Sequence, residues 1–167
     1  RPFPSNGLSF YLLKSTIMIQ RIQSVYLLAT AILMIICMCN PVGSILTPNN
    51  EIASFTNLYI SMAEGAKDYA PWALFVILLF VAILAMVTIF LYKKRMLQIR
   101  LTIYSCILLI GYYITLVVFA TMMLPDDTSF TPSWLVCLPF AALVFNWLAI
   151  RSIGADEALV KAYDRLR

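Results

Sequence analysis

Histidine is absent from the 167 residues, and charged residues make up only 12% of them. Without histidine, the chain cannot form His-ligated haem, most catalytic zinc sites or an imidazole general base. A soluble domain carries about 25% charged residues, whereas 62% of this chain is hydrophobic and its mean hydropathy is +0.89. A soluble core could not bury so much apolar surface, so the composition predicts an integral membrane protein.

The chain also lacks the short motifs of common catalytic and cofactor sites. It contains no Gly-rich phosphate loop, no G-x-S-x-G or S-x-x-K nucleophile signature and no spacing typical of metal ligands. We therefore assign no catalytic residue, no metal site and no cofactor, and we favour a protein that is not an enzyme. The formal net charge of +4 is too small to indicate a nucleic-acid partner.

Four long and mainly apolar segments separate the polar parts of the chain. Each is long enough, at ~1.5 Å per helical residue, to cross a ~30 Å hydrocarbon layer. We predict an all-α membrane fold in which four transmembrane helices form an antiparallel bundle. The predicted helices cover residues 20–39, 71–92, 99–124 and 132–150.

Prolines place several helix ends and predict one kink. Asn40-Pro41-Val42-Gly43 should end the first helix, and Pro71 should begin the second. Thr131-Pro132 should cap the fourth helix. Pro139 then falls inside that helix, where it should bend the chain and free the carbonyl of Leu135.

Residues 18–167 are expected to form a single transmembrane domain that is preceded by a leader. Residues 1–17 open with turn-forming residues and contain only a brief apolar run. We predict that translation starts at Met18 and that the leader is non-native or disordered. The alternative is a genuine cytoplasmic or interfacial arm.

Two polar appendages flank the predicted helices. The first is the outer loop 42–70, in which we predict a small hairpin between 43–46 and 55–60. The second is the cytoplasmic tail 151–167, in which a short helix over 156–166 should follow a break at Gly154. One apolar face of that helix can dock a partner or rest on lipid headgroups. The residues of this face are Leu159, Tyr163 and Leu166.

Lysine and arginine fall almost entirely on one side of the predicted topology. Eleven of the twelve lie on that side, and Lys67 alone lies on the other. Short loops rich in these residues stay in the cytoplasm, so both termini are predicted to be cytoplasmic. The basic loop between the second and third helices should also contact anionic lipid headgroups. The residues that determine the topology are Arg21, Lys93, Lys94, Arg95, Arg100 and Arg151.

Three of the four cysteines, those other than Cys106, allow a redox hypothesis. Cys37 and Cys39 lie near the outer end of the first predicted helix, Cys137 lies in the outer half of the fourth, and Cys106 lies near the inner end of the third. Membrane thiol oxidases that reduce quinone resemble this set, but they use a C-x-x-C pair where this chain has C-x-C. The favoured interpretation is that the cysteines are small apolar packing residues.

Polar side chains inside the predicted helices form a further candidate site. Tyr112 and Tyr113 lie near the middle of the membrane, where their hydroxyl groups need partners. Together with Asn146 they predict a polar seam for an internal or lipid ligand, and simple packing is the alternative. We also expect hydrogen bonds between helices from Asn146, Thr30, Thr88, Ser105, Thr115 and Thr121.

Both ends of the main domain resemble a known family. The segments are Met18-Ile-Gln-Arg-Ile-Gln-Ser-Val-Tyr-Leu-Leu28 and Asp156-Glu-Ala-Leu-Val-Lys-Ala-Tyr-Asp-Arg-Leu-Arg167. They are similar to a family of small four-helix inner-membrane proteins of Bacteroidota, a domain of unknown function with the number four-two-nine-three. The resemblance covers Met18 to Arg167 and favours Met18 as the start. It implies the location and topology but no activity, substrate or catalytic residue.

The function favoured by these observations is that of a small, non-enzymatic subunit or scaffold of the bacterial inner membrane. Its partners would be membrane lipids and either a membrane protein or a second copy of the chain. They would bind at the outer loop or at the tail helix. A membrane thiol–quinone oxidoreductase and a lipid or small-molecule carrier are the alternatives.

Overall fold

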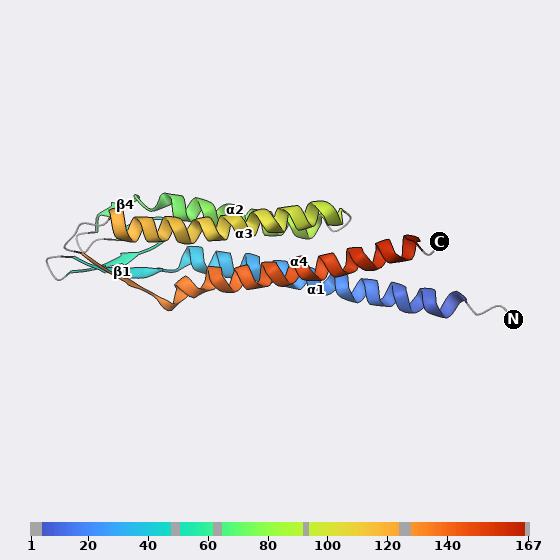
Figure 1. The fold of residues 1–167 in the computed structure, drawn as a ribbon. Coiled ribbons are helices and arrows are strands. Elements are labelled where there is room, and N and C mark those ends of the chain that lie inside the picture. Colours follow the sequence, from blue (N-terminus) through green and yellow to red (C-terminus); the bar gives the residue numbers. More distant parts are fainter. Residues whose placement is uncertain (1–4, 48–50, 62–64, 92–93, 124–127, 166–167) are drawn as a thin grey trace.

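Long helices dominate the computed structural model, which describes residues 5–47, 51–61, 65–91, 94–123 and 128–165. The side chains of residues 5–21, 95, 123, 156–157 and 159–165 lie outside that description. Four long helices lie side by side (Figure 1). They are α1 (Ser5–Cys39), α2 (Trp72–Phe90), α3 (Arg95–Val118) and α4 (Cys137–Arg165). A π-helical turn, η1 (Phe119–Met123), continues α3, and a 3-10 turn, η2 (Trp134–Val136), precedes α4.

Each long helix contains a stretch that is long and apolar enough to cross a membrane. The four stretches are Ile22–Cys39, Trp72–Phe90, Met96–Met122 and Trp134–Ala155. Large apolar side chains remain exposed on every one of these helices, as Ile32, Phe80, Ile107 and Phe140 illustrate. Such surfaces are unfavourable in water and are the expected surface in hydrocarbon. The composition and the helices therefore agree with a multi-pass membrane protein.

The helices pack around a shared core. Helix α1 contacts α2 and α4, and α3 contacts the same two helices. Large side chains without exposed surface fill the space between them, among them Met34, Leu74, Leu78 and Leu109. The core positions recur every three or four residues along each helix, which keeps one face of each helix inward.

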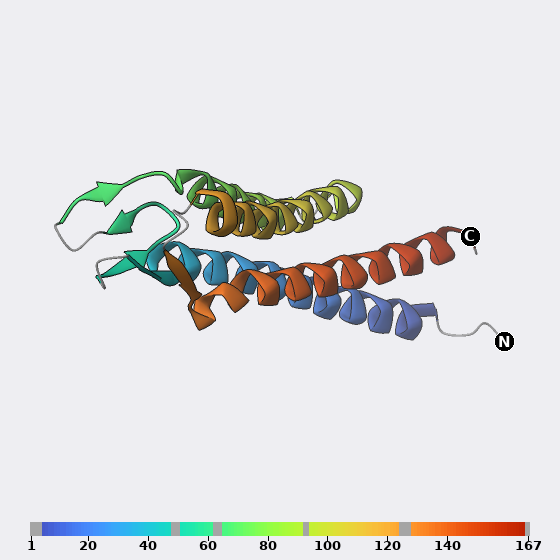
Figure 2. The same cartoon turned by 60° about the vertical axis from the view of Figure 1, so that its left-hand side comes forward.

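A five-stranded antiparallel sheet closes one end of the molecule. It lies opposite the first turn of α1 and the last turn of α4 (Figures 1 and 2). The strand order is β4-β3-β2-β1-β5, so β1 lies between a strand of the first loop and a strand of the second. The strands are β1 (Gly43–Leu46), β2 (Ile52–Phe55), β3 (Ile60–Ser61), β4 (Lys67–Asp68) and β5 (Ser129–Pro132).

Strand β1 fixes the register of the sheet. Gly43 pairs with Phe55 on one side and with Pro132 on the other. The ladder is extended by the backbone of Val42, which donates to Phe55 (2.8 Å) and accepts from Ser133 (2.8 Å). The sheet thus joins two connections that are far apart in the sequence.

Aromatic side chains pack between the sheet and the helix ends. The ring of Phe55 lies 5.3 Å from the ring of Phe130 and 5.4 Å from the ring of Phe119. Phe119 begins the π-helical turn η1, and it is almost fully buried. Aromatic contacts at these separations add to the free energy gained from burial. This cluster attaches the sheet to α3.

The sheet corrects two predictions about the outer loops. The fold is not purely α-helical, and strand 43–46 pairs with Ile52–Phe55 rather than with 55–60. Thr131 and Pro132 do not cap the fourth helix, because they form the end of the edge strand β5. An edge strand tolerates proline because one of its sides needs no ladder hydrogen bond.

Two predicted helix boundaries and one predicted kink were also wrong. Helix α1 begins at Ser5 rather than near residue 20, so helix covers part of the predicted leader. Helix α4 runs unbroken through Gly154 to Arg165, so the tail has no separate helix over 156–166. Pro139 lies in the first turn of α4, where its missing N–H has no intrahelical acceptor, and the predicted kink has no basis there.

Candidate functional site

A buried asparagine joins the sheet to two helices. Asn57 lies in the turn between β2 and β3 and has no exposed surface. Its side-chain amide donates to the carbonyl of Cys37 on α1 (2.8 Å), and its oxygen accepts from the hydroxyl of Tyr112 on α3 (2.8 Å). These hydrogen bonds hold the buried amide in one position, because any movement that breaks them leaves buried polar groups unpaired. The turn is therefore held against α1 and α3.

The adjacent residues Tyr112 and Tyr113 both form hydrogen bonds near the end of the molecule that carries the sheet. The hydroxyl of Tyr112 reaches Asn57, and the hydroxyl of Tyr113 donates to the carbonyl of Val136 (2.6 Å) just before α4. Their rings meet edge to face at 5.6 Å. Both hydroxyls are thus occupied by the protein itself, and the structure does not bring the tyrosines together with Asn146.

Asn146 instead forms a separate polar bridge between three helices. Its amide nitrogen donates to the hydroxyl of Ser105 on α3 (2.9 Å). The hydroxyl of Thr30 on α1 lies 3.3 Å from its oxygen and 3.1 Å from the carbonyl of Tyr26. All three side chains of the bridge are buried. The predicted hydrogen bonds between helices are confirmed for Asn146, Thr30 and Ser105, and they connect α4 with both of its neighbours. The prediction was wrong for three threonines, whose hydroxyls bond to carbonyls of their own helices: Thr88, Thr115 and Thr121.

Replacing Asn146 by leucine is expected to lower the free energy of unfolding by about 1–2 kcal/mol. Hydrogen bonds between transmembrane helices average ~0.6 kcal/mol, with a maximum of ~1.7, and this change removes two contacts. Reversible unfolding of the purified chain in mixed micelles measures the loss. Thr121→Val is the matched control, since its hydroxyl bonds only to Val117 in its own helix at an exposed position. An equal loss in both variants would contradict the bridging role.

Among the side chains that the structure describes, Gln23 is buried with an unsatisfied amide nitrogen. It is 4% exposed, and its amide nitrogen has no hydrogen-bond partner in the part of the chain that the structure describes. An unpaired buried polar group costs about 1–3 kcal/mol. Gln23→Leu should therefore raise the free energy of unfolding of the purified chain by about 1 kcal/mol or more. A variant that is less stable than the original would show that the amide makes a favourable interaction in the folded chain.

The cysteines occupy different environments, and all four are free thiols. Cys37 is buried beneath the sheet, where the amide nitrogen of Asn57 lies 3.8 Å from its sulfur. Cys39 and Cys137 are exposed, and Cys106 is half-buried. Thiol–disulfide exchange requires access to the attacked sulfur. The burial of Cys37 therefore gives no support to a redox role for the set.

Only part of the predicted basic and docking residues falls within the described chain. Lys94, Arg100 and Arg151 are exposed, and the guanidinium of Arg151 lies 5.9 Å from the ring of Trp147. The remaining topology residues and the docking residues are outside the described residues or side chains. These are Lys93, Leu166 and the side chains of Arg21, Arg95, Leu159 and Tyr163.

Among the side chains that the structure describes, no three His, Cys, Asp or Glu residues come together as metal ligands. The residue that sequence reasoning missed is Asn57. It follows Thr56 in a turn, a position where asparagine normally bonds to nearby backbone in water. Nothing in the local sequence indicates that Tyr112, from a helix far along the chain, would donate a hydrogen bond to it.

The helices and their contacts define the chain as a helical protein with four potential membrane-spanning segments. Over residues 19–166 its sequence matches the family described as "Domain of unknown function (DUF4293)", and the chain belongs to that family. The match confirms the family that the two end segments resemble. No curated protein shows a significant match to the chain.

Proposed function

We propose that this chain is a multi-pass protein of the inner membrane of a bacterium of the Bacteroidota, with both termini in the cytoplasm. The distribution of charge supports this orientation. If the four apolar stretches cross the membrane in turn, eleven of the twelve basic residues lie on the same side as the termini, which is the pattern of the cytoplasmic side. The four helices would then form an antiparallel bundle, and the sheet would project from the outer surface.

Within that membrane, the chain acts as a non-enzymatic scaffold or subunit that binds a partner protein through its outer sheet. The observation that carries this proposal is a pair of exposed apolar side chains on an anchored sheet. Leu46 and Ile52 pair across β1 and β2, and they are 41% and 73% exposed. A sheet that Asn57 and Tyr112 hold to the helices presents this pair in a fixed position, which lowers the ordering cost of binding.

The edges of the sheet favour side-chain contact over strand addition. Pro132 ends the edge strand β5, and the opposite edge strand β4 has only two residues. Short edges and proline oppose pairing with another strand. Lys67 on β4 lies over the ring of Tyr59 at 4.8 Å, so this edge also carries a charge. A partner would therefore bind the apolar pair on the hairpin.

The orientation is tested by labelling single sites in spheroplasts. Ile52→Cys should react with an impermeant maleimide in intact spheroplasts, whereas Lys94→Cys should react only after the membrane is opened. The unsubstituted chain provides the background from its four native thiols. Labelling of Lys94→Cys from outside would reverse the proposed topology.

Partner binding is tested by a photo-crosslinking amino acid in place of Ile52 in living cells. The expected result is one discrete protein adduct that is absent when the same group replaces Tyr104, which is exposed on α3. The adduct should survive deletion of residues 156–167, which distinguishes the sheet from the tail as the docking element. Complete absence of an adduct at position 52 would contradict the scaffold proposal.

A further inference from the structure

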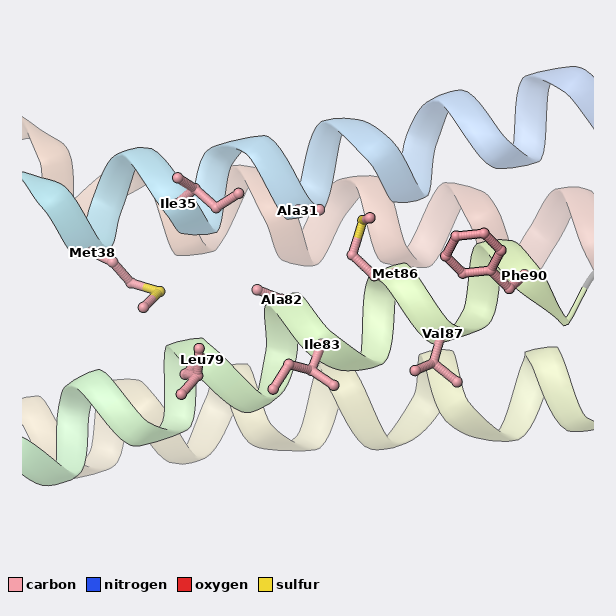
Figure 3. Close-up of a pocket in the computed structure, with 9 residues that line it drawn as sticks. All are labelled: Ala31, Ile35, Met38, Leu79, Ala82, Ile83, Met86, Val87 and Phe90. Carbon is pink, nitrogen blue, oxygen red and sulfur yellow. The ribbon is translucent and has the colours of Figure 1, made fainter.

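An apolar groove lies between α1 and α2, on the side of the molecule away from α3 and α4. Its cavity volume is about 320 Å³, which is at the lower end of the range for small-molecule sites. Figure 3 shows its lining residues on the two helices, with Phe90 at one end. Small residues, Ala31 and Ala82, form its floor, and every lining residue is apolar. The residues on its rim are Ile35, Ile83, Met86 and Phe90.

The dimensions of the groove correspond to one leaflet of a bilayer. Along α2 it extends from Leu79 to Phe90, roughly 16 Å at ~1.5 Å per residue, which is about half of a ~30 Å hydrocarbon layer. The length and the volume of the groove match a single hydrocarbon chain that lies along one leaflet. A helix of a second copy is the competing occupant, and the test below separates the two.

The positive charge that follows one end of the groove favours a lipid with an anionic headgroup. Phe90, at one end of the groove, is the last residue of α2. The basic turn, by which we mean the segment between α2 and α3 that contains Lys94, follows it in the chain, and the backbone N–H of Lys94 donates to the carbonyl of Leu91 (2.9 Å). Lys94 is exposed. The sequence contains no acidic residue between Asp68 and Asp126. A phosphate at this end would meet positive charge without a competing carboxylate from α2 or α3.

We propose that the groove binds one acyl chain of an anionic phospholipid whose phosphate contacts Lys94 in the basic turn. This inference rests on the proposed membrane orientation, which places the basic turn at the cytoplasmic leaflet. The methionines of the lining, Met38 and Met86, are flexible and can adapt to chains of different length and saturation. The lipid would fill the space between α1 and α2 and connect the first helix hairpin to the membrane surface.

Native mass spectrometry of the purified full chain tests the lipid site. The probes are phosphatidylglycerol and phosphatidylcholine with identical acyl chains, each added to the chain in mild detergent. Phosphatidylglycerol should remain bound at least five-fold more than phosphatidylcholine. Met86→Trp and, independently, Ile83→Trp should reduce that binding at least five-fold by filling the groove. Ile107→Trp, on the exposed face of α3 away from the groove, should leave it unchanged.

Lys94→Glu distinguishes the contribution of the headgroup to lipid binding from that of the acyl chain. This variant should lose the preference for phosphatidylglycerol and bind both lipids to a similar, low extent. Equal retention of the two lipids by the original chain, or full retention by both groove variants, would overturn the proposal. A lipid-free dimer that both groove variants dissociate would also overturn it and would assign the groove to a second copy. These measurements contain no partner protein, so they are independent of crosslinking at Ile52.

Discussion

Replacing Gly43 by valine is expected to lower the free energy of unfolding by about 2–3 kcal/mol, the upper part of the range for an overpacked core. A Cβ atom at this position would lie 2.7 Å from a ring carbon of Phe130 and 2.8 Å from the backbone oxygen of Thr131. Neither neighbour can move freely, because Phe130 packs on Phe55 and Thr131 belongs to the ladder between β1 and β5. The added side chain therefore has to displace β5.

Unfolding of the purified variant in mixed micelles, followed by tryptophan fluorescence, measures this loss. Limited proteolysis should also cut β5 faster, because displacement exposes its backbone. Gly111→Ala is the matched control. Its Cβ would meet nothing within 4 Å, and alanine favours helix over glycine by about 1 kcal/mol. We expect the control to gain stability, and a Gly43→Val variant as stable as the original would disprove the close packing of β1 on β5.

The second large effect is expected from Asn57→Leu, which should lower the free energy of unfolding by about 2–6 kcal/mol. The substitution leaves two buried groups without partners, the hydroxyl of Tyr112 and the carbonyl of Cys37. Each unpaired group costs about 1–3 kcal/mol. Tyr112→Phe should cost less, about 1–3 kcal/mol, because only the oxygen of Asn57 loses its partner.

A double-mutant cycle tests whether these two residues act together. Because Tyr112 and Asn57 share one hydrogen bond, the combined variant should be less destabilised than the sum of the two single changes. The unfolding free energies of the four proteins, measured in the same micelles, give the coupling directly. Strictly additive losses would show that the two side chains do not interact, and that the sheet is held by the aromatic cluster alone.

The long apolar helices were predictable because their signal is local. A run such as Trp72–Phe90 must be apolar along its whole length, whatever packs against it. Proline 71 then marks its start through its own missing N–H. By contrast, Gly154 is tolerated within α4 at a cost of only about 1 kcal/mol, so the break that we predicted at this glycine was wrong.

The sheet and the buried polar contacts were less predictable because their signals are distributed. Strand β5 has four residues, ends in proline and has no alternating apolar pattern. It is stabilised as a strand by its pairing with β1, which the local sequence does not indicate. Asn57 and Tyr112 are ordinary residues of a turn and a helix until the fold brings them together. For the same reason, Tyr112 was placed in a membrane seam with Asn146 although it contacts the sheet.

The position of β1 between β2 and β5 has a consequence for how the chain is made. During synthesis the first two helices and the first loop emerge before residues 129–132, so β1 then has a neighbour on one side only. Its other side presents unpaired backbone groups, which are prone to wrong pairing. Correct assembly therefore depends on the prompt synthesis of β5, which follows α3, and a ribosome that stalls before residue 129 would leave an intermediate in which one side of β1 is unpaired.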